Sequence, residues 1–251
     1  MTMTDNTQRF TGKVEAYERY RQRYPAEEIL AILREWCGLT PANVIADVGA
    51  GTGMLADVFL DNGNRVLAIE PNADMRAAMT PQPNLEIVDA TAEETTLPAG
   101  SVDMVTAGRA FHWFKHELAL PEFERILKPG GWVVLVSLGR DDDGSSQMQT
   151  FGELIARHNA DFTQIVRAGY RIHERLHEFF PGDLHQTKII GSLQLDWEEF
   201  LGHALSLSVT PKPEDPRYPA FEADLRAHFD EYAHDGALDL PTACRIAAGR
   251  P

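Results

Sequence analysis

The fold of this chain is decided by Asp47-Val48-Gly49-Ala50-Gly51-Thr52-Gly53, a glycine-rich run that joins the apolar strand-like segment 44–48 to a predicted helix over 54–60. Its glycines let the backbone turn tightly and approach a ligand, and the start of the helix adds free N–H donors. The spacing is G-x-G-x-G, whereas a dinucleotide-binding loop follows G-x-G-x-x-G. Asp47 would repel a pyrophosphate but could meet an ammonium group. The run therefore predicts a ligand site that favours a cation.

Strand and helix patterns alternate on both sides of this run. Short apolar runs predict strands over 44–48, 66–69, 85–88, 102–107 and 132–138, and strand-like patterns return at 185–195 and 238–249. Amphipathic patterns predict helices over 25–38, 54–60, 74–79, 114–127, 197–207 and 218–234, and residues 147–180 are helical in pattern throughout. This alternation is typical of an α/β protein with a parallel sheet.

The length predicts one domain over residues 1–251. We expect residues 1–24 to form an N-terminal lid, 40–138 the cofactor-binding core, 141–182 a helical insertion or cap, and 183–251 the C-terminal strands and helices that complete the sheet.

Composition narrows the classes of partner. The formal net charge is −15, from 38 acidic and 23 basic residues, and such a field disfavours nucleic acid and anionic membranes as partners. No apolar run approaches the ~20 residues of a membrane helix. The polar start, Met1 to Arg9, lacks the apolar region of a secretory signal, so we expect a cytoplasmic protein. We also expect a monomer or a homodimer. Two cysteines, Cys37 and Cys244, predict neither a disulfide framework nor a cysteine zinc site.

Acidic residues stand at the ends of three successive predicted strands. Glu70 follows the second strand, where a carboxylate can accept hydrogen bonds from two ribose hydroxyls. Asp89 follows the third strand, a position suited to an exocyclic amine. Together with Asp47 these acids suit a cationic nucleoside without phosphates, and S-adenosylmethionine is such a ligand.

With these motifs the chain resembles the class I S-adenosylmethionine-dependent methyltransferases, particularly the small-molecule type 11 group that includes trans-aconitate-methyltransferase-like proteins. The matching segments are Val44 to Met54, Val66 to Pro71, Val88 to Glu93, Ser101 to Phe114 and Arg125 to Gly131. The flanks Tyr17 to Pro25 and Ser206 to Gly249 are also similar, and the likeness is weakest at 141–182. The resemblance implies a Rossmann-like, seven-stranded, mostly parallel sheet with helices on both faces, a helical cap and an antiparallel last strand. It also implies methyl transfer to a small molecule.

The resemblance also implies roles for individual residues. The methionine portion of the donor would lie along the glycine loop, with Asp47 near its ammonium group, and Glu70 would hold the ribose. The remaining cofactor-binding positions would be Gly49, Ala50, Gly51 and Gly53 in the loop, Pro71 or Asn72 beside the adenine, Asp89 and Ala90 at the adenine edge, and Gly108 beneath the methionine chain. The N-terminal segment departs from the family pattern, because Gln22 stands where a proline is expected.

A sulfonium is already an activated methyl donor, so an in-line displacement mainly needs alignment and exclusion of water. A carboxylate acceptor needs no base, whereas a hydroxyl or ammonium acceptor would use His112 as the general base. The alternative is that His112 only forms part of an aromatic wall. Tyr17 and Arg21 come from the expected lid, where we expect Tyr17 to be a catalytic residue together with His112. Arg21 could bind the methionine carboxylate of the cofactor, bind an anionic acceptor, or lie on the surface.

Three alternatives stay open. A nicotinamide-dependent oxidoreductase would share the strand–loop–helix pattern, and a non-catalytic module could bind S-adenosylmethionine without turnover. The segment His173-Glu174-Arg175-Leu176-His177 matches the H-E-x-x-H zinc motif. Phe180 and Asp183 break the extended form of that motif, so we predict no metal site.

Overall fold

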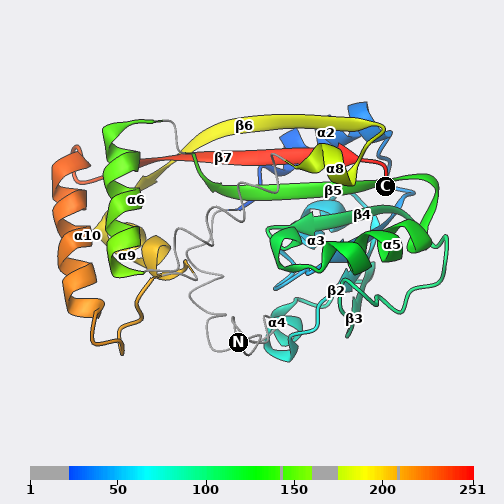
Figure 1. Cartoon of the computed structure of the whole chain (residues 1–251), viewed down its shortest axis with the longest axis horizontal. Coiled ribbons are helices and arrows are strands. Elements are labelled where there is room, and N and C mark those ends of the chain that lie inside the picture. Colours follow the sequence, from blue (N-terminus) through cyan, green and yellow to red (C-terminus); the bar gives the residue numbers. More distant parts are fainter. Residues whose placement is uncertain (1–22, 142–143, 160–174, 208–209) are drawn as a thin grey trace.

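The computed structural model describes residues 23–141, 144–159, 175–207 and 210–251 (Figure 1). Its centre is one seven-stranded sheet with the order β3-β2-β1-β4-β5-β7-β6. The strands are β1 (Val44–Val48), β2 (Arg65–Ile69), β3 (Leu85–Val88), β4 (Val102–Gly108), β5 (Leu127–Arg140), β6 (Leu184–Leu195) and β7 (Leu238–Gly249). The first five strands pair in parallel, and β7 runs antiparallel to both β5 and β6. The predicted Rossmann-like sheet with an antiparallel last strand is confirmed.

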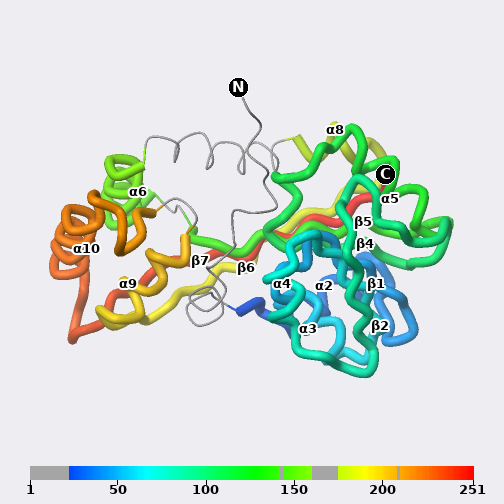
Figure 2. The backbone as a smooth tube through the Cα atoms, turned by 90° about the horizontal axis from the view of Figure 1, so that it is seen from below, coloured from blue at the N-terminus to red at the C-terminus, as the bar shows by residue number. Residues whose placement is uncertain are grey.

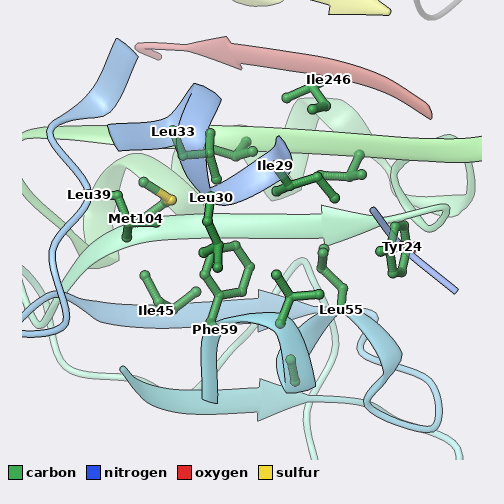
Figure 3. Packing of buried hydrophobic residues seen from close by; sticks show 14 of the residues in the cluster. Tyr24, Ile29, Leu30, Leu33, Leu39, Ile45, Leu55, Phe59, Met104 and Ile246 are labelled. Atoms are coloured by element: carbon green, nitrogen blue, oxygen red, sulfur yellow. The ribbon is translucent and has the colours of Figure 1, made fainter. Parts of the chain in front are cut away.

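Helices cover both faces of this sheet. They are α2 (Ala26–Cys37), α3 (Met54–Asp61), α4 (Ala73–Ala78), α5 (His116–Ile126), α6 (Ser146–His158), α8 (Leu176–Phe179), α9 (Trp197–Leu205) and α10 (Tyr218–Tyr232), together with the 3-10 turn η2 (Phe111–Trp113). On one face α2 and α3 bury Ile29, Leu33 and Phe59 against the sheet, and Figure 3 shows these side chains packed together. On the other face α5 and α8 contribute Phe123 and Leu176 to a second core.

The central strands are mostly apolar, as expected for strands that are covered on both faces. β1 and β4 are buried at nearly every position. Strand β5 begins at Leu127, five residues before the predicted start at Trp132, because the Leu-Lys-Pro-Gly-Gly run pairs with the beginning of β4 across a shift in register between Val102 and Met104.

Helices α6, α9 and α10 pack on one another at a distance from the first two cores. β5, β6 and β7 have 14, 12 and 12 residues, and each is longer than any of β1 to β4. The long strands extend past the core helices and carry the three helices at their far end (Figure 2). We call this unit the helical cluster; its core includes Phe151, Phe200 and Phe221. Helices 197–205 and 218–232, which we expected to complete the sheet, thus join α6 beyond the carboxyl end of β5.

Within the described ranges, no helix is long and apolar enough to cross a membrane.

Candidate functional site

A pocket lies at the carboxyl ends of β1 and β4, with about 280 Å³ of empty space that includes its open mouth. It combines three separate parts of the sequence. These are Tyr24 just ahead of α2, the end of β1 with the glycine loop and the start of α3, and the end of β4 with Arg109. Its lining residues are Tyr24, Asp47, Gly49, Ala50, Gly51, Thr52, Met54, Leu55, Gly108 and Arg109. Ligands of open α/β sheets bind at this edge. Five predicted positions, Asp47, Gly49, Ala50, Gly51 and Gly108, come together in this pocket.

The glycine loop has the conformation that its sequence predicts. Gly49, Gly51 and Gly53 have φ angles of +69°, +61° and +90°, in the left-handed region that favours glycine. The N–H groups of Gly49 and Ala50 donate to the carbonyl of Ile69 at 2.8 and 3.1 Å, which ties the loop to β2. A Cβ on Gly49 would lie 2.6 Å from the Cβ of Ala110, so a side chain there would push the two loops apart.

Asp47 is a buried carboxylate on the pocket wall, with only 1% of its surface exposed. Its Oδ1 accepts a hydrogen bond from Thr106 Oγ1 at 2.8 Å. Its Oδ2 is buried and has no hydrogen-bond partner among the described residues. Burial raises the pKa of Asp47 to about 7, the Thr106 hydroxyl opposes this shift, and the nearby charge of Glu70 adds to it. A buried carboxylate oxygen of this kind suits a cationic group of a ligand.

Glu70 has a second role that its position in the sequence does not reveal. Its Oε2 accepts from the Gly51 N–H at 2.9 Å, and its Oε1 accepts from the Asn72 N–H at 2.8 Å. The carboxylate therefore bridges the glycine loop and the start of α4, where the Asn72 side chain caps the helix by accepting from the Met75 N–H. Burial raises the pKa of Glu70, and the two backbone N–H groups oppose the shift. Each carboxylate oxygen keeps a second lone pair for a ligand.

The other acid at a strand end is exposed. Asp89 Oδ2 pairs with Arg76 Nη2 at 2.7 Å, and 69% of its side-chain surface is accessible. Arg76 also donates to the Glu70 carbonyl at 2.8 Å, so this arginine links the ends of β2 and β3. Ala90 is buried and Pro71 is partly buried, and neither they nor Asp89 belong to the pocket lining.

His112 lies in the turn η2, between β4 and α5. Its ring contacts the Trp113 ring in a tilted arrangement, with 4.5 Å between the ring centroids. Burial, assisted by the nearby His116, lowers the pKa of His112 to about 4. The imidazole is therefore neutral at pH 7 and only weakly basic.

Tyr24 and Arg109 complete the pocket. Tyr24 belongs to the segment predicted as a lid, but it packs into the first core beside Leu55, as Figure 3 shows. Arg109 was not predicted as a site residue. It has a φ of +55°, an unusual conformation for a residue other than glycine. Its backbone N–H donates to the Val136 carbonyl at 2.9 Å. Its guanidinium lies 5.2 Å from the centre of the Tyr24 ring. No sequence pattern distinguishes an arginine that will take this conformation.

The predicted residues Tyr17 and Arg21 lie outside the described residues, as do His173 and Glu174 of the H-E-x-x-H segment. His177 of that segment lies in α8. Across the described ranges, no group of three or more histidine, cysteine, aspartate or glutamate residues could hold a metal ion.

Residues 46–135 match a family model described as a methyltransferase domain. An uncharacterized methyltransferase of Mycobacterium bovis is 38% identical over 152 residues, which is 59% of this chain and 59% of that protein. A methyltransferase-like protein of Schizosaccharomyces pombe is 28% identical over 69% of this chain and 65% of its own length. The chain thus spans about three fifths of the first curated relatives that it matches.

Solved structures share the fold over most of the chain. A protein from Anaeromyxobacter dehalogenans, assigned as a type II methyltransferase, superposes with a TM-score of 0.69 at 24% identity, over 92% of this chain and 98% of that one. A protein from Anabaena variabilis, assigned as a methyltransferase of an antibiotic biosynthesis pathway, has a TM-score of 0.65 at 21% identity, over 91% and 99%.

Proposed function

We propose that this chain, whose residues 46–135 match a methyltransferase domain, transfers a methyl group from S-adenosylmethionine to a small-molecule acceptor. The observation that carries the proposal is the Asp47 carboxylate, which is buried at the glycine loop with one oxygen lacking a described partner. A buried carboxylate is costly unless a cation compensates it. The α-ammonium group of S-adenosylmethionine is a cation of suitable size.

The residues around Asp47 fit the rest of the methionine portion. Gly49 and Gly51 carry no side chain, so the backbone of the glycine loop itself forms part of the pocket wall. Arg109 supplies a guanidinium on the same lining, which offers a positive partner for the α-carboxylate. When it is bound, S-adenosylmethionine supplies an activated methyl group on its sulfonium.

The proposed nucleoside contacts begin at Glu70. Its two free lone pairs would accept from the ribose hydroxyls, while the Gly51 and Asn72 N–H groups hold the carboxylate in place. Pro71, Asp89 and Ala90 would border the adenine. In the N-terminal segment, Tyr17 stays a proposed catalytic residue and Arg21 a proposed contact of the cofactor.

The state of His112 bears on the acceptor. Because its pKa is lowered to about 4, the imidazole is a poor base for a hydroxyl or an ammonium group. A carboxylate is ionised at pH 7 and needs no base. We therefore favour a carboxylate oxygen as the methylated atom, with in-line displacement as the mechanism. In this proposal His112 acts as part of the wall that excludes water.

Two measurements test the proposed function. S-adenosylhomocysteine should raise the melting temperature, and NAD should not. At a hundredfold excess over its dissociation constant, the bound ligand adds ~2.7 kcal/mol to the free energy of unfolding. A shift with NAD alone would support the oxidoreductase alternative. Transfer of a labelled methyl group across a panel of acceptors separates the enzyme from the non-catalytic module. The cytoplasmic location, the monomer or homodimer, and the absence of nucleic-acid and membrane partners stay predictions.

A further inference from the structure

We propose that Arg76 is a positioning residue for recognition of the donor's adenine base, because it fixes the Asp89 carboxylate beside Glu70. The inference rests on the proposed function, which borders the adenine with Asp89 and the ribose with Glu70. It concerns the carboxyl ends of β2 and β3 and the helix α4, next to the glycine loop.

The sheet brings Glu70 and Asp89 side by side. The last residues of β2 and β3, Ile69 and Val88, pair in parallel, and the Glu70 N–H donates to the Val88 carbonyl at 3.1 Å. Glu70 and Asp89 are the next residues along the chain, and neighbouring strands lie about 4.8 Å apart. Glu70 contacts the glycine loop through the Gly51 N–H, so Asp89 lies one strand farther from that loop. A nucleoside whose ribose lies at Glu70 would therefore extend its base toward Asp89.

Arg76 holds the two strand ends together from the helix α4. Its Nη1 donates to the Glu70 carbonyl at 2.8 Å, and its Nη2 donates to Asp89 Oδ2 at 2.7 Å. Only 19% of the Arg76 side-chain surface is exposed. A guanidinium is planar and donates in fixed directions, and one of its two acceptors here is a backbone carbonyl. The pair of bonds therefore sets the orientation of the Asp89 carboxylate relative to β2.

Asp89 depends on this bond because its side chain is otherwise exposed. Of its side-chain surface 69% is accessible, and its Oδ1 accepts no hydrogen bond from the described residues. An exposed carboxylate without an anchor changes rotamers, and its immobilisation by a ligand lowers the affinity about two- to tenfold. The bond from Arg76 fixes Asp89 before the ligand arrives and leaves Oδ1 available to accept from it.

The positive charge of Arg76 also acts on Glu70. Burial raises the pKa of Glu70, and the charge of Arg76 opposes this rise together with the two backbone N–H groups. Carboxylates at neighbouring strand ends repel each other, and a cation beside both lowers that cost. Loss of Arg76 should therefore weaken any ligand whose ribose bonds to Glu70, whatever base it carries. This common loss has to be separated from the effect on Asp89.

The chemistry of a carboxylate defines which base it favours. An ionised carboxylate oxygen only accepts hydrogen bonds. Adenine offers the N–H groups of its 6-amino substituent, whereas hypoxanthine has a carbonyl oxygen at the same position, which a carboxylate repels. An anchored Asp89 therefore favours adenine over hypoxanthine. Because the two nucleosides share the ribose and the amino acid portion, the ratio of their affinities reports on the base contact and not on Glu70.

Calorimetry with S-adenosylhomocysteine and with S-inosylhomocysteine tests this role on the full chain. The wild type should bind the adenosyl ligand at least about tenfold more tightly, the gain expected from one charged hydrogen bond. Asp89→Ala should abolish this preference. Arg76→Met should weaken both ligands and also reduce the preference about two- to tenfold. Arg76→Lys keeps the charge without the planar fork, so it should recover the common affinity while the preference stays reduced.

The matched control is Arg65→Met, which removes the same charge from an exposed ion pair with Glu86 at 2.8 Å that joins β2 and β3 away from their carboxyl ends. It should leave both affinities unchanged. An Arg76→Met variant that weakens both ligands equally would overturn the positioning role, and Arg76→Lys decides by the same ratio if Arg76→Met does not fold. An unchanged preference in Asp89→Ala would overturn the base contact. If S-adenosylhomocysteine does not bind the wild type at all, the proposed function fails, and the role of Arg76 fails with it.

Discussion

Replacement of Asp47 by asparagine should stabilise the unliganded protein increasingly as the pH rises. The folded pKa of this buried carboxyl is raised from 3.8 to about 7, so the folded state keeps a proton that the unfolded chain loses. Stability therefore falls as the pH rises from about 4 to about 7. One pKa unit corresponds to about 1.4 kcal/mol, so the wild type should lose about 2–3 kcal/mol between about pH 5 and pH 8 through this group. Asparagine does not titrate and avoids this loss.

The same substitution should weaken S-adenosylhomocysteine binding, because the ligand's ammonium group loses its carboxylate partner. In the wild type the affinity should increase about tenfold per pH unit below about 7 and then level off, as Asp47 becomes ionised. In Asp47→Asn the affinity should change little over the same range. A substitution that increases stability while it decreases ligand affinity is the pattern expected of a residue kept for binding.

Urea unfolding at about pH 5 and pH 8 measures the stability difference, and calorimetry measures the affinity. The difference between variant and wild type should grow by about 2–3 kcal/mol from the lower pH to the higher. A constant cost from the new, unpartnered amide N–H group cancels in this comparison. Asp235→Asn, at an exposed turn residue, makes the same change in net charge and should show no such growth. Parallel pH profiles for the wild type and Asp47→Asn would refute the reasoning.

Three further predictions concern the pocket and the zinc-like segment. In thermal melts, Gly108→Ala should destabilise the protein by about 1–3 kcal/mol, because its Cβ would lie 2.6 Å from the Tyr24 hydroxyl. The control is Gly152→Ala on α6, where a Cβ meets no described atom within 4 Å; this change should be neutral or slightly stabilising. Glu70→Gln should weaken S-adenosylhomocysteine binding by about 1–3 kcal/mol in calorimetry, because the amide cannot accept from both backbone N–H groups. An unchanged affinity would contradict both its bridging role and its ribose role. Purified protein should contain far less than one zinc per chain by elemental analysis, and stoichiometric metal that is lost when both histidines of the H-E-x-x-H segment are replaced would show that a zinc site exists.

Local sequence patterns were sufficient for the positions of the strands along the chain and for the glycine loop. Continuous apolar runs such as 44–48 form strands because both faces of a central parallel strand are buried. Gly49, Gly51 and Gly53 adopt positive φ angles that other residues avoid. Apolar runs and glycine spacing determine the backbone conformation of the few residues around them. They placed Asp47 and Glu70 at the carboxyl edge because every parallel strand ends there.

Contacts between distant parts of the chain depended on the tertiary structure. Tyr24 belongs to the pocket because it packs with Leu55 in the first core, and Arg109 takes a left-handed conformation because the Val136 carbonyl holds its backbone N–H. The sequence marks Glu70 only as an acid after a strand, whereas packing brings the Gly51 N–H to it. The bonds of Lys188 and Arg245 to Asp141 form only when three strands pair in one register. Periodicity along the chain defines each element and its buried face, but side chains far apart in sequence meet only after the whole sheet is assembled.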